Sequence, residues 1–253
     1  MAELMNRPIL ICLLTFVALW GASRLGAAQR KKQGPMSDEE REDFGMIVAA
    51  TLTLLGLIIG FTFSMATGRY DQRKNYEEAE ANAIGTEYVR ADLLPAGNAE
   101  KVRGLLKIYL DQRVLFYKSR DAEELQQVNA RTATLQTELW NAVKAPAESA
   151  QTAVATLTLS GMNDVLNSQG YTQAAWWNRI PTAAWGLMWA IAIFCNLMIG
   201  YYLRPTDRRW MRAVVMPLVV SVSFMLIADI DSPRGGMIRV QPQNLVSLAG
   251  SLK

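Results

Sequence analysis

The segment from Gly45 to Leu94 constrains the fold most, because an apolar stretch passes directly into a charged one without a helix breaker. Residues 46–66 hold no charged side chain over 21 positions, and no proline follows until Pro95. At about 1.5 Å per residue, a helix of this length crosses a hydrocarbon layer roughly 30 Å thick. Good helix formers continue beyond Arg69. The segment predicts one long helix that leaves the membrane and continues into water.

Small residues recur on one face of this apolar stretch. Gly56, Gly60, Ser64 and Gly68 are each four positions apart, which places them on nearly the same side of a helix. Such a pattern is typical of close helix packing in membranes. The same smooth face is also compatible with the lining of a conduit in an oligomer, and both interpretations stay open at this point.

Further apolar clusters indicate a membrane protein, since 51% of the 253 residues are apolar and they gather into separate stretches. Four stretches are long enough to span a bilayer: Ile9 to about Leu25, Met46 to Ala66, Thr182 to Leu203, and Ala213 to Ile230. The first also resembles a secretory signal peptide, because Arg7 precedes its apolar core and small residues follow. We expect it to remain as a span.

The residue inventory argues against several function classes. Histidine is absent, which removes imidazole metal ligation and histidine-based catalysis. The only cysteines, Cys12 and Cys195, fall inside predicted spans and suggest no disulfide framework. No phosphate-binding glycine loop or nucleophile elbow is present. We therefore expect neither an enzyme nor a bound cofactor, and a net charge of +3 gives no signal for nucleic acid.

The order of these segments predicts an all-α protein with four transmembrane helices and a helical domain inserted between the second and third spans. The expected divisions are a first transmembrane helix at 1–28, a connector at 29–45, the candidate pore helix at 46–66, the helical domain at 67–181, the third transmembrane helix at 182–203, a short basic loop at 204–212, the fourth transmembrane helix at 213–230 and a C-terminal tail at 231–253.

Local signals predict where helices begin and end. Ser37 and Glu40 have the spacing of a capping box and predict a short helix that leads into the second span. Asn98 is expected to cap the second helix of the inserted domain. A third helix is expected over 121–144, and a fourth over 147–167 with Gly170 after it.

Residues at the expected membrane edges carry further hypotheses. Trp176 and Trp177 precede the third span, where paired tryptophans are typical of an interfacial aromatic belt. Asp229 ends the fourth span, and a carboxylate there suggests either an ion pair with Arg234 or Arg239, or an interaction with ions. The basic residues divide evenly between the two sides of the membrane, so charge alone predicts no orientation.

Three of these motifs resemble a known family when they are taken in order. Gly60-Phe61 followed by Arg69-Tyr70-Asp71-x-Arg73 resembles the second transmembrane helix of bacterial bestrophins. Ile180-Pro181 resembles the start of their third span, and the acidic segment from Asp229 to Gly235 resembles the one after their fourth. The resemblance covers nearly the whole chain, which is more similar to the bestrophin-like membrane family of unassigned function than to bestrophins proper.

This resemblance implies a homopentamer in the bacterial inner membrane, with the second spans around a central pore. It places both termini and residues 67–181 in the cytosol. Bestrophins carry bulky apolar residues every fourth position in the pore neck, where this chain has Gly56, Gly60 and Ser64. Only Asp229 and Asp231 match the acidic calcium clasp, and they are the candidate metal ligands.

The favoured function is an oligomeric ion channel with Gly56, Gly60 and Ser64 lining the pore and Ile180 at a cytosolic constriction. The expected partners are membrane lipid, inorganic ions and further copies of the chain. Anions are slightly favoured over cations, and the candidate vestibule charges are Arg69, Asp71, Arg73 and Lys74. The alternative is a non-conducting scaffold or sensor whose helical domain binds a protein partner.

Overall fold

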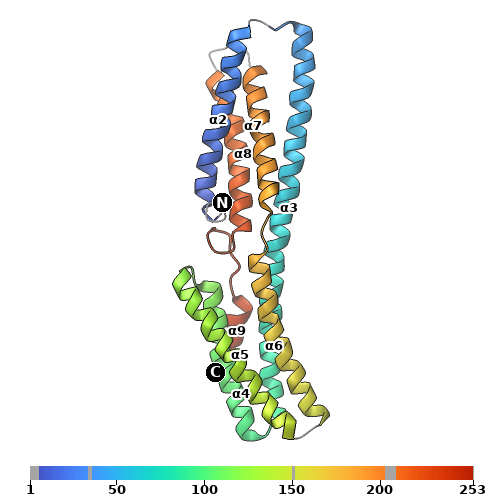
Figure 1. Ribbon diagram of the computed structural model, residues 1–253, viewed down its shortest axis with the longest axis vertical. Helices are drawn as coiled ribbons and strands as arrows, with labels where there is room; N and C mark the ends of the chain where they lie inside the picture. Colours follow the sequence, from blue (N-terminus) through green and yellow to red (C-terminus); the bar gives the residue numbers. More distant parts are fainter. Residues whose placement is uncertain (1–5, 34–35, 150–151, 203–208, 253) are drawn as a thin grey trace. The chain divides into compact units, whose positions relative to one another are not determined.

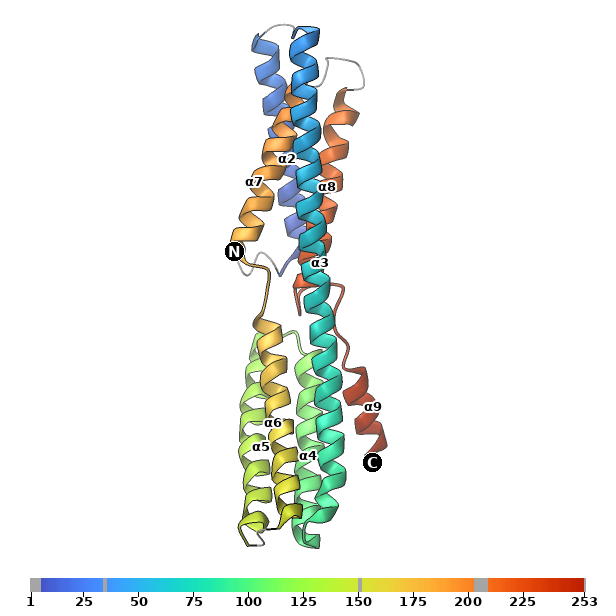
Figure 2. The same cartoon turned by 90° about the vertical axis from the view of Figure 1, so that its right-hand side faces the viewer.

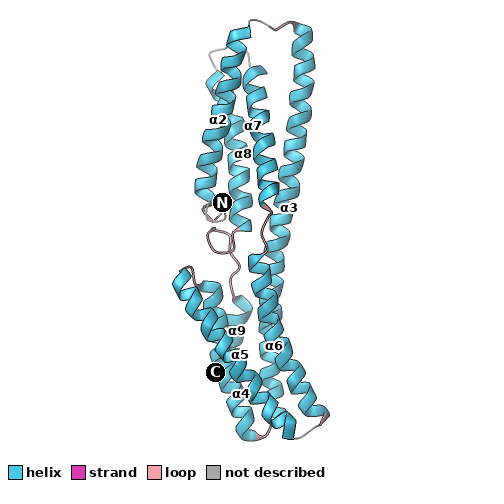
Figure 3. Cartoon of the chain, viewed as in Figure 1, coloured by secondary structure: helices cyan, strands magenta, loops and turns pink. Residues whose placement is uncertain are grey.

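The computed structural model describes residues 6–33, 36–149, 152–202 and 209–252, and every regular element within these ranges is helical (Figures 1 and 3). The elements are α2 (Pro8–Gln33), α3 (Asp38–Arg90), the 3₁₀ helix η1 (Ala91–Leu93), α4 (Ala96–Lys118), α5 (Ala122–Ser149), α6 (Ala153–Trp177), α7 (Thr182–Tyr202), α8 (Arg209–Asp231) and α9 (Gln243–Ser251). Unit 1 comprises Met1–Arg69 and Arg179–Arg239, and unit 2 comprises Tyr70–Asn178 and Val240–Lys253.

Unit 1 contains α2, the first part of α3, α7 and α8, which lie side by side in both views (Figures 1 and 2). Within the described ranges, four helical stretches are long and apolar enough to cross a membrane, and each overlaps one predicted span. The prediction of an all-α chain with several long apolar helices is thus confirmed. The predicted basic loop at 204–212 lies mostly outside the described residues.

Close contact between α2 and α7 depends on two glycines. A Cβ at Gly26 would overlap the backbone oxygen of Leu197, and a Cβ at Gly200 would overlap the backbone oxygen of Ser23. Small residues at such crossings let two backbones approach closely, which favours association of helices in membranes. The tightest glycine-dependent contact within unit 1 therefore lies between α2 and α7.

The helix α3 runs for 53 residues without interruption. Its start carries the predicted capping box: Ser37 N–H donates to Glu40 Oε2 over 2.9 Å, and Glu40 N–H donates to Ser37 Oγ over 3.1 Å. The expectation of a separate short helix was wrong, because the capping box begins α3 itself. This start satisfies two of the N–H groups that a helix N-terminus leaves without partners.

Unit 2 is a bundle of α4, α5, α6, the second part of α3 and the short helix α9 (Figure 2). One apolar face of each helix enters a common core, as expected for amphipathic helices that pack in water. The largest fully buried apolar residues of this core are Tyr109, Phe116, Ile84, Leu106, Leu110, Leu135 and Leu139.

Several expected boundaries in unit 2 were wrong. The cap of α4 is Pro95 and Asn98 lies inside the helix. Helix α6 begins later than expected, with Thr152 Oγ1 accepting a hydrogen bond from Ala155 N–H, and passes through Gly170. Helix α5 continues through Pro146 to Ser149. Packing against neighbouring helices overrides a weak local breaker when the buried face continues beyond it.

The tryptophan pair and the C-terminal segment also differ from expectation. Trp176 is buried in unit 2, with ring centroids 5.0 Å from Phe116 and 5.4 Å from Tyr117. It therefore belongs to the helical core and not to an aromatic belt, whereas Trp177 is exposed. The expected polar tail contains the helix α9, whose Leu245 is fully buried in the core of unit 2.

Candidate functional site

The face of α3 that carries Gly56, Gly60 and Ser64 is not covered by other described residues. Gly56, Gly60 and Ser64 are all exposed. A Cβ added at Gly56, Gly60 or Gly68 would meet no atom within 4 Å. Because this face packs against no other part of the chain that the structure describes, both interpretations of it, helix packing and pore lining, involve a second copy or another molecule.

A second row of residues on α3, which the sequence reasoning missed, lies beside the small one. Leu57, Phe61 and Met65 are also four positions apart, and they are 52%, 64% and 43% exposed. Each follows one small residue in the sequence, so the two rows occupy adjacent strips of the helix surface. The sequence signal for this row is the spacing of four positions between Leu57, Phe61 and Met65.

The four candidate vestibule charges fall into two groups. Asp71 and Lys74 are exposed. Arg73 is buried, and its Nε donates to the backbone oxygen of Ala175 over 3.3 Å. Arg69 is largely buried and forms an ion pair of 3.7 Å with Asp231. Of the four, Asp71 and Lys74 have side chains that are open to water in this chain.

Asp231 joins several segments at the end of unit 1 where α8 ends. Its Oδ1 accepts a hydrogen bond from Ile180 N–H over 3.1 Å, and its carboxylate pairs with Arg69 and Arg179. Burial lowers the pKa of Arg179, and the negative charge of Asp231 acts against this effect. Ile180 itself is 3% exposed, so its side chain packs inside the chain. The arrangement ties the start of α7 to α3 and α8.

Asp229 has a different set of partners from those considered in the sequence. Its carboxylate accepts hydrogen bonds from Met237 N–H over 2.7 Å and from Ile238 N–H over 2.8 Å. Gly236 lies so close that a Cβ there would meet the Asp229 carboxylate at 2.9 Å. Both candidate metal ligands, Asp229 and Asp231, thus bind donors of the protein. Within the described ranges, no three histidine, cysteine, aspartate or glutamate residues form a group that could hold a metal.

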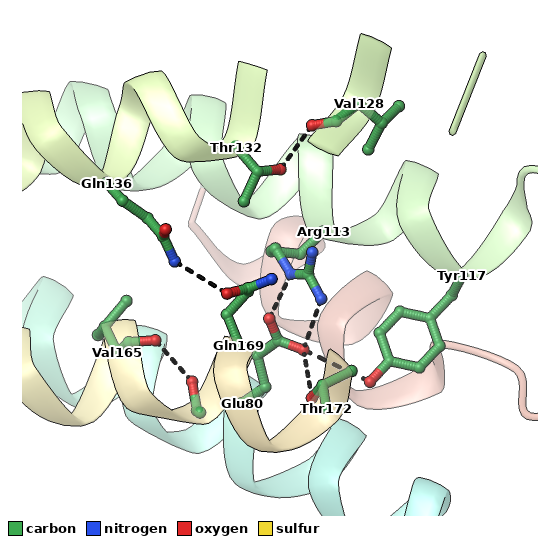
Figure 4. Close-up of polar contacts among 10 residues, drawn as sticks. Glu80, Arg113, Tyr117, Val128, Thr132, Gln136, Val165, Gln169 and Thr172 are labelled. Atoms are coloured by element: carbon green, nitrogen blue, oxygen red, sulfur yellow. Dashed lines mark hydrogen bonds and ion pairs between the residues drawn. The ribbon is translucent and has the colours of Figure 1, made fainter. Parts of the chain in front are cut away.

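The part of α3 that lies in unit 2 buries a stripe of charged residues, of which Figure 4 shows Glu80. The stripe follows helical spacing and consists of Arg73, Glu77, Glu80 and Glu87, all at most 2% exposed. Buried charges are costly unless other groups neutralise or hydrogen-bond them. Glu77 and Glu80 meet this requirement through different partners, whereas Glu87 has no hydrogen-bond partner among the described residues.

Glu80 lies at the centre of a buried network (Figure 4). Its carboxylate forms an ion pair with Arg113 and accepts hydrogen bonds from Tyr117 Oη over 3.4 Å and Thr172 Oγ1 over 3.2 Å. Burial alone would lower the pKa of Arg113, but the charge of Glu80 raises it overall. The network joins α3, α4 and α6 in one polar cluster.

Glu77 fastens the C-terminal helix. Its Oε1 accepts a hydrogen bond from Leu245 N–H over 2.9 Å, and its Oε2 accepts one from Asn244 Nδ2 over 2.7 Å. Both donors lie in the first turn of α9, where backbone N–H groups lack helical partners and a negative charge is favourable. A carboxylate about 170 positions earlier in the chain thus caps α9.

Glu87 is buried against Gly161 without a partner of this kind. A Cβ at Gly161 would overlap Glu87 Oε2, so only glycine leaves room for the carboxyl group. Among the described residues, neither carboxyl oxygen of Glu87 has a hydrogen-bond partner. Burial raises the pKa of Glu87 to about 8, with Arg90 opposing the rise and Asp164 adding to it. The carboxyl is therefore mostly protonated at neutral pH.

The stability of unit 2 is expected to fall as the pH rises through neutrality because of Glu87. Since the folded-state pKa of about 8 exceeds the ordinary value of 4.5, the stabilisation is complete below pH 4.5 and is lost as the pH rises to about 8. At about 1.4 kcal/mol per pH unit in this window, the loss between pH 6 and 9 is about 3 kcal/mol. Unfolding curves at both pH values should show this loss in the wild type.

The matched variants separate Glu87 from other acids. Glu87→Gln should lose most of this pH dependence, because the amide does not ionise. Glu78→Gln, an exposed position on the same helix, should keep it. Equal pH dependence in the wild type and Glu87→Gln would contradict the assignment.

Comparisons with known proteins place this geometry in a family. The model of the Bestrophin-like domain matches residues 9–245. A bacterial bestrophin homolog from Klebsiella pneumoniae is similar, with a TM-score of 0.65 and 14% identity over 96% of this chain and 98% of that chain. A variant of the Klebsiella pneumoniae homolog has a TM-score of 0.63 and 14% sequence identity, and the match covers 97% of both chains. The structure of a membrane protein variant has a TM-score of 0.61 and 16% sequence identity, and the match covers 96% of this chain and 99% of that chain.

At these identities the structural likeness shows that the chain has the fold of bacterial bestrophin homologs. A comparison with curated protein sequences found no match.

Proposed function

The chain belongs to the bestrophin-like family, and from this premise we propose that it forms an oligomeric ion channel lined by the exposed face of α3. The observation that carries the proposal is the bare row of Gly56, Gly60 and Ser64 on a helix apolar enough to span a membrane. A membrane helix with such a face gains from association, and the described residues of the single chain supply no partner for it. The family resemblance favours a pentamer.

The width of the proposed pore depends on which of the two adjacent rows on α3 faces the lumen. If Gly56, Gly60 and Ser64 face the lumen, the pore is wide at this level. If Leu57, Phe61 and Met65 face it instead, they form a hydrophobic constriction that hinders wetting. Ile180, a candidate constriction in the sequence, is buried in its own chain, so we assign the pore lining to α3.

Substitutions in the two rows test the proposal. Gly60→Phe should abolish the current in lipid bilayers while the oligomer persists in size-exclusion chromatography, because the new ring narrows the lumen. Gly186→Phe is the matched control, since Gly186 is also exposed on a membrane helix with no atom near its Cβ. Its current should be unchanged.

The remaining outcomes distinguish between the two rows as pore lining, and between the channel and its alternatives. An increased current in Phe61→Ala, with Gly60→Phe unchanged, would assign the constriction to the bulky row. Loss of the oligomer in Gly60→Phe would favour helix packing on this face. An intact wild-type oligomer without any current would contradict the channel and favour the non-conducting scaffold or sensor.

We propose that the channel prefers anions. Of the four candidate vestibule charges, Lys74 is the exposed basic residue that would attract anions, and Asp71 is the exposed acidic one. Reversal potentials in asymmetric salt decide between anions and cations. A potential that follows the cation gradient would overturn the preference.

We also propose that the protein lies in a bacterial inner membrane with its termini and unit 2 in the cytosol, as the resemblance implies. A cysteine at the exposed Gln126 should react with an impermeant reagent only after the cells are opened. Reaction in intact cells would reverse the orientation.

A further inference from the structure

A pocket of about 690 Å³ lies in unit 1 where α2 ends and α3 begins. Its walls come from the last turns of α2, the first turns of α3 and the C-terminal part of α7. The lining residues include Arg30, Glu40, Asp43, Phe44, Phe194 and Tyr201. These positions lie at the ends of three apolar helices, which is the level of lipid headgroups for a chain that spans a membrane.

One wall of the pocket contains an arginine, Arg30, whose guanidinium group stacks on an aromatic ring. The guanidinium of Arg30 lies over the ring of Tyr201, 5.6 Å from the ring centroid. Tyr201 is itself positioned by a hydrogen bond to Gln33 and by the ring of Phe44 at a centroid distance of 5.2 Å. An arginine stacked through its face keeps its N–H edges available, and these match the oxygens of a phosphate.

The wall of the pocket that α3 forms presents two carboxylates. Glu40 and Asp43 are three positions apart on α3, so they lie on the same face of its first turns. One oxygen of Glu40 accepts the capping hydrogen bond from Ser37 N–H. Among the described residues, Arg30, Glu40 and Asp43 form no ion pair with one another. The pocket therefore holds positive and negative groups that form no direct ion pair with each other.

Below these charges the pocket becomes apolar. Ile47, Phe194 and Leu197 line it, and Ile47 and Phe194 are 52% and 54% exposed. Ile47 follows Asp43 by four positions on the same face of α3. The surface thus passes from charged to apolar along the direction in which a lipid molecule passes from headgroup to acyl chain.

From this arrangement we infer that the pocket binds a phospholipid whose headgroup carries both a phosphate and an ammonium group. Arg30 binds the phosphate, Asp43 and Glu40 bind the ammonium, and the apolar wall contacts the first part of an acyl chain. An anionic lipid without an ammonium group would leave the two carboxylates unpaired. A free headgroup would leave the apolar wall without a partner.

The experiment measures lipid binding to the purified, delipidated oligomer by native mass spectrometry. The probes are phosphatidylethanolamine, phosphatidylglycerol and free phosphoethanolamine at equal concentrations. Phosphatidylethanolamine should bind the wild type most tightly. Arg30→Gln and Asp43→Asn should each weaken this binding about tenfold, as expected for the loss of one charge-assisted contact.

Matched controls are present in the same helices. Arg24 also stacks on an aromatic ring, Trp20, at 5.5 Å, but it does not line the pocket. Glu42 is exposed on α3 beside Asp43 and faces elsewhere. Arg24→Gln and Glu42→Gln should bind phosphatidylethanolamine as the wild type does.

Three results would overturn the inference. Equal or tighter binding of phosphatidylglycerol would remove the role of the carboxylates. Equal binding of free phosphoethanolamine would remove the role of the apolar wall. Unchanged lipid binding in both Arg30→Gln and Asp43→Asn, with the oligomer intact in size-exclusion chromatography, would place the lipid elsewhere. None of these readouts depends on whether the protein conducts ions.

Discussion

Replacing Arg113 with methionine is expected to destabilise unit 2 by about 3 to 5 kcal/mol, the cost typical of leaving one member of a buried ion pair without its partner. Arg113 and Glu80 are both fully buried, and of its donors among the described residues the Glu80 carboxylate would retain Tyr117 and Thr172. Chemical unfolding followed by tryptophan fluorescence should report the loss, because Trp176 packs against Phe116 and Tyr117 beside this network.

A double variant distinguishes the effect of losing the buried ion pair from the effect of changing side-chain size. Arg113→Met combined with Glu80→Leu removes both charges, and buried pairs replaced in this way by apolar residues are often neutral or more stable. The double variant should therefore recover most of the stability lost by Arg113→Met. Lys118→Met, at an exposed position of α4, should change little. A double variant as unstable as the single one would show that shape, and not charge, is decisive.

Replacing Gly200 with alanine is expected to disrupt the packing of α2 on α7 in unit 1. The added methyl group would overlap the backbone oxygen of Ser23, which cannot rotate away as a side chain can. Overpacking typically costs about 1 to 3 kcal/mol, and a clash with backbone places this variant at the upper end, about 3 kcal/mol. Thermal unfolding in detergent should show a lower midpoint, and Gly26→Ala should behave alike.

The control for this prediction lies in the same helix. Gly186 of α7 has no atom within 4 Å of an added Cβ, so Gly186→Ala should be neutral or slightly stabilising because alanine favours helix more than glycine does. A midpoint in Gly200→Ala equal to that of Gly186→Ala would contradict the close crossing.

The candidate site could be predicted from the sequence only in part. The regular spacing of Gly56, Gly60 and Ser64 is a property of one helix, so their common face follows from position alone. The roles expected for Arg73 and Ile180 required knowledge of which side of each segment is buried. The metal hypothesis for Asp229 and Asp231 depended on partners such as Met237 N–H and Arg69, which no spacing rule identifies.

The sequence by itself determined the features that arise from neighbours along the chain. The lengths of the apolar stretches, the unbroken course of α3 and the capping box at Ser37 and Glu40 depend on contacts within one or two helical turns. The family resemblance could be stated for the same reason, because its motifs are contiguous.

Only the tertiary structure decided which charged residues of α3 are buried and what meets them. Glu77, Glu80 and Glu87 recur at helical spacing, but hydrophobic periodicity cannot detect a buried stripe that is made of charges. Their surroundings are the N-terminus of α9, Arg113 and Gly161, all distant in the chain. Distant groups offset the desolvation of Glu77 and Glu80, whereas Glu87 lacks such partners among the described residues and is mostly protonated at neutral pH. The fold alone creates these different surroundings.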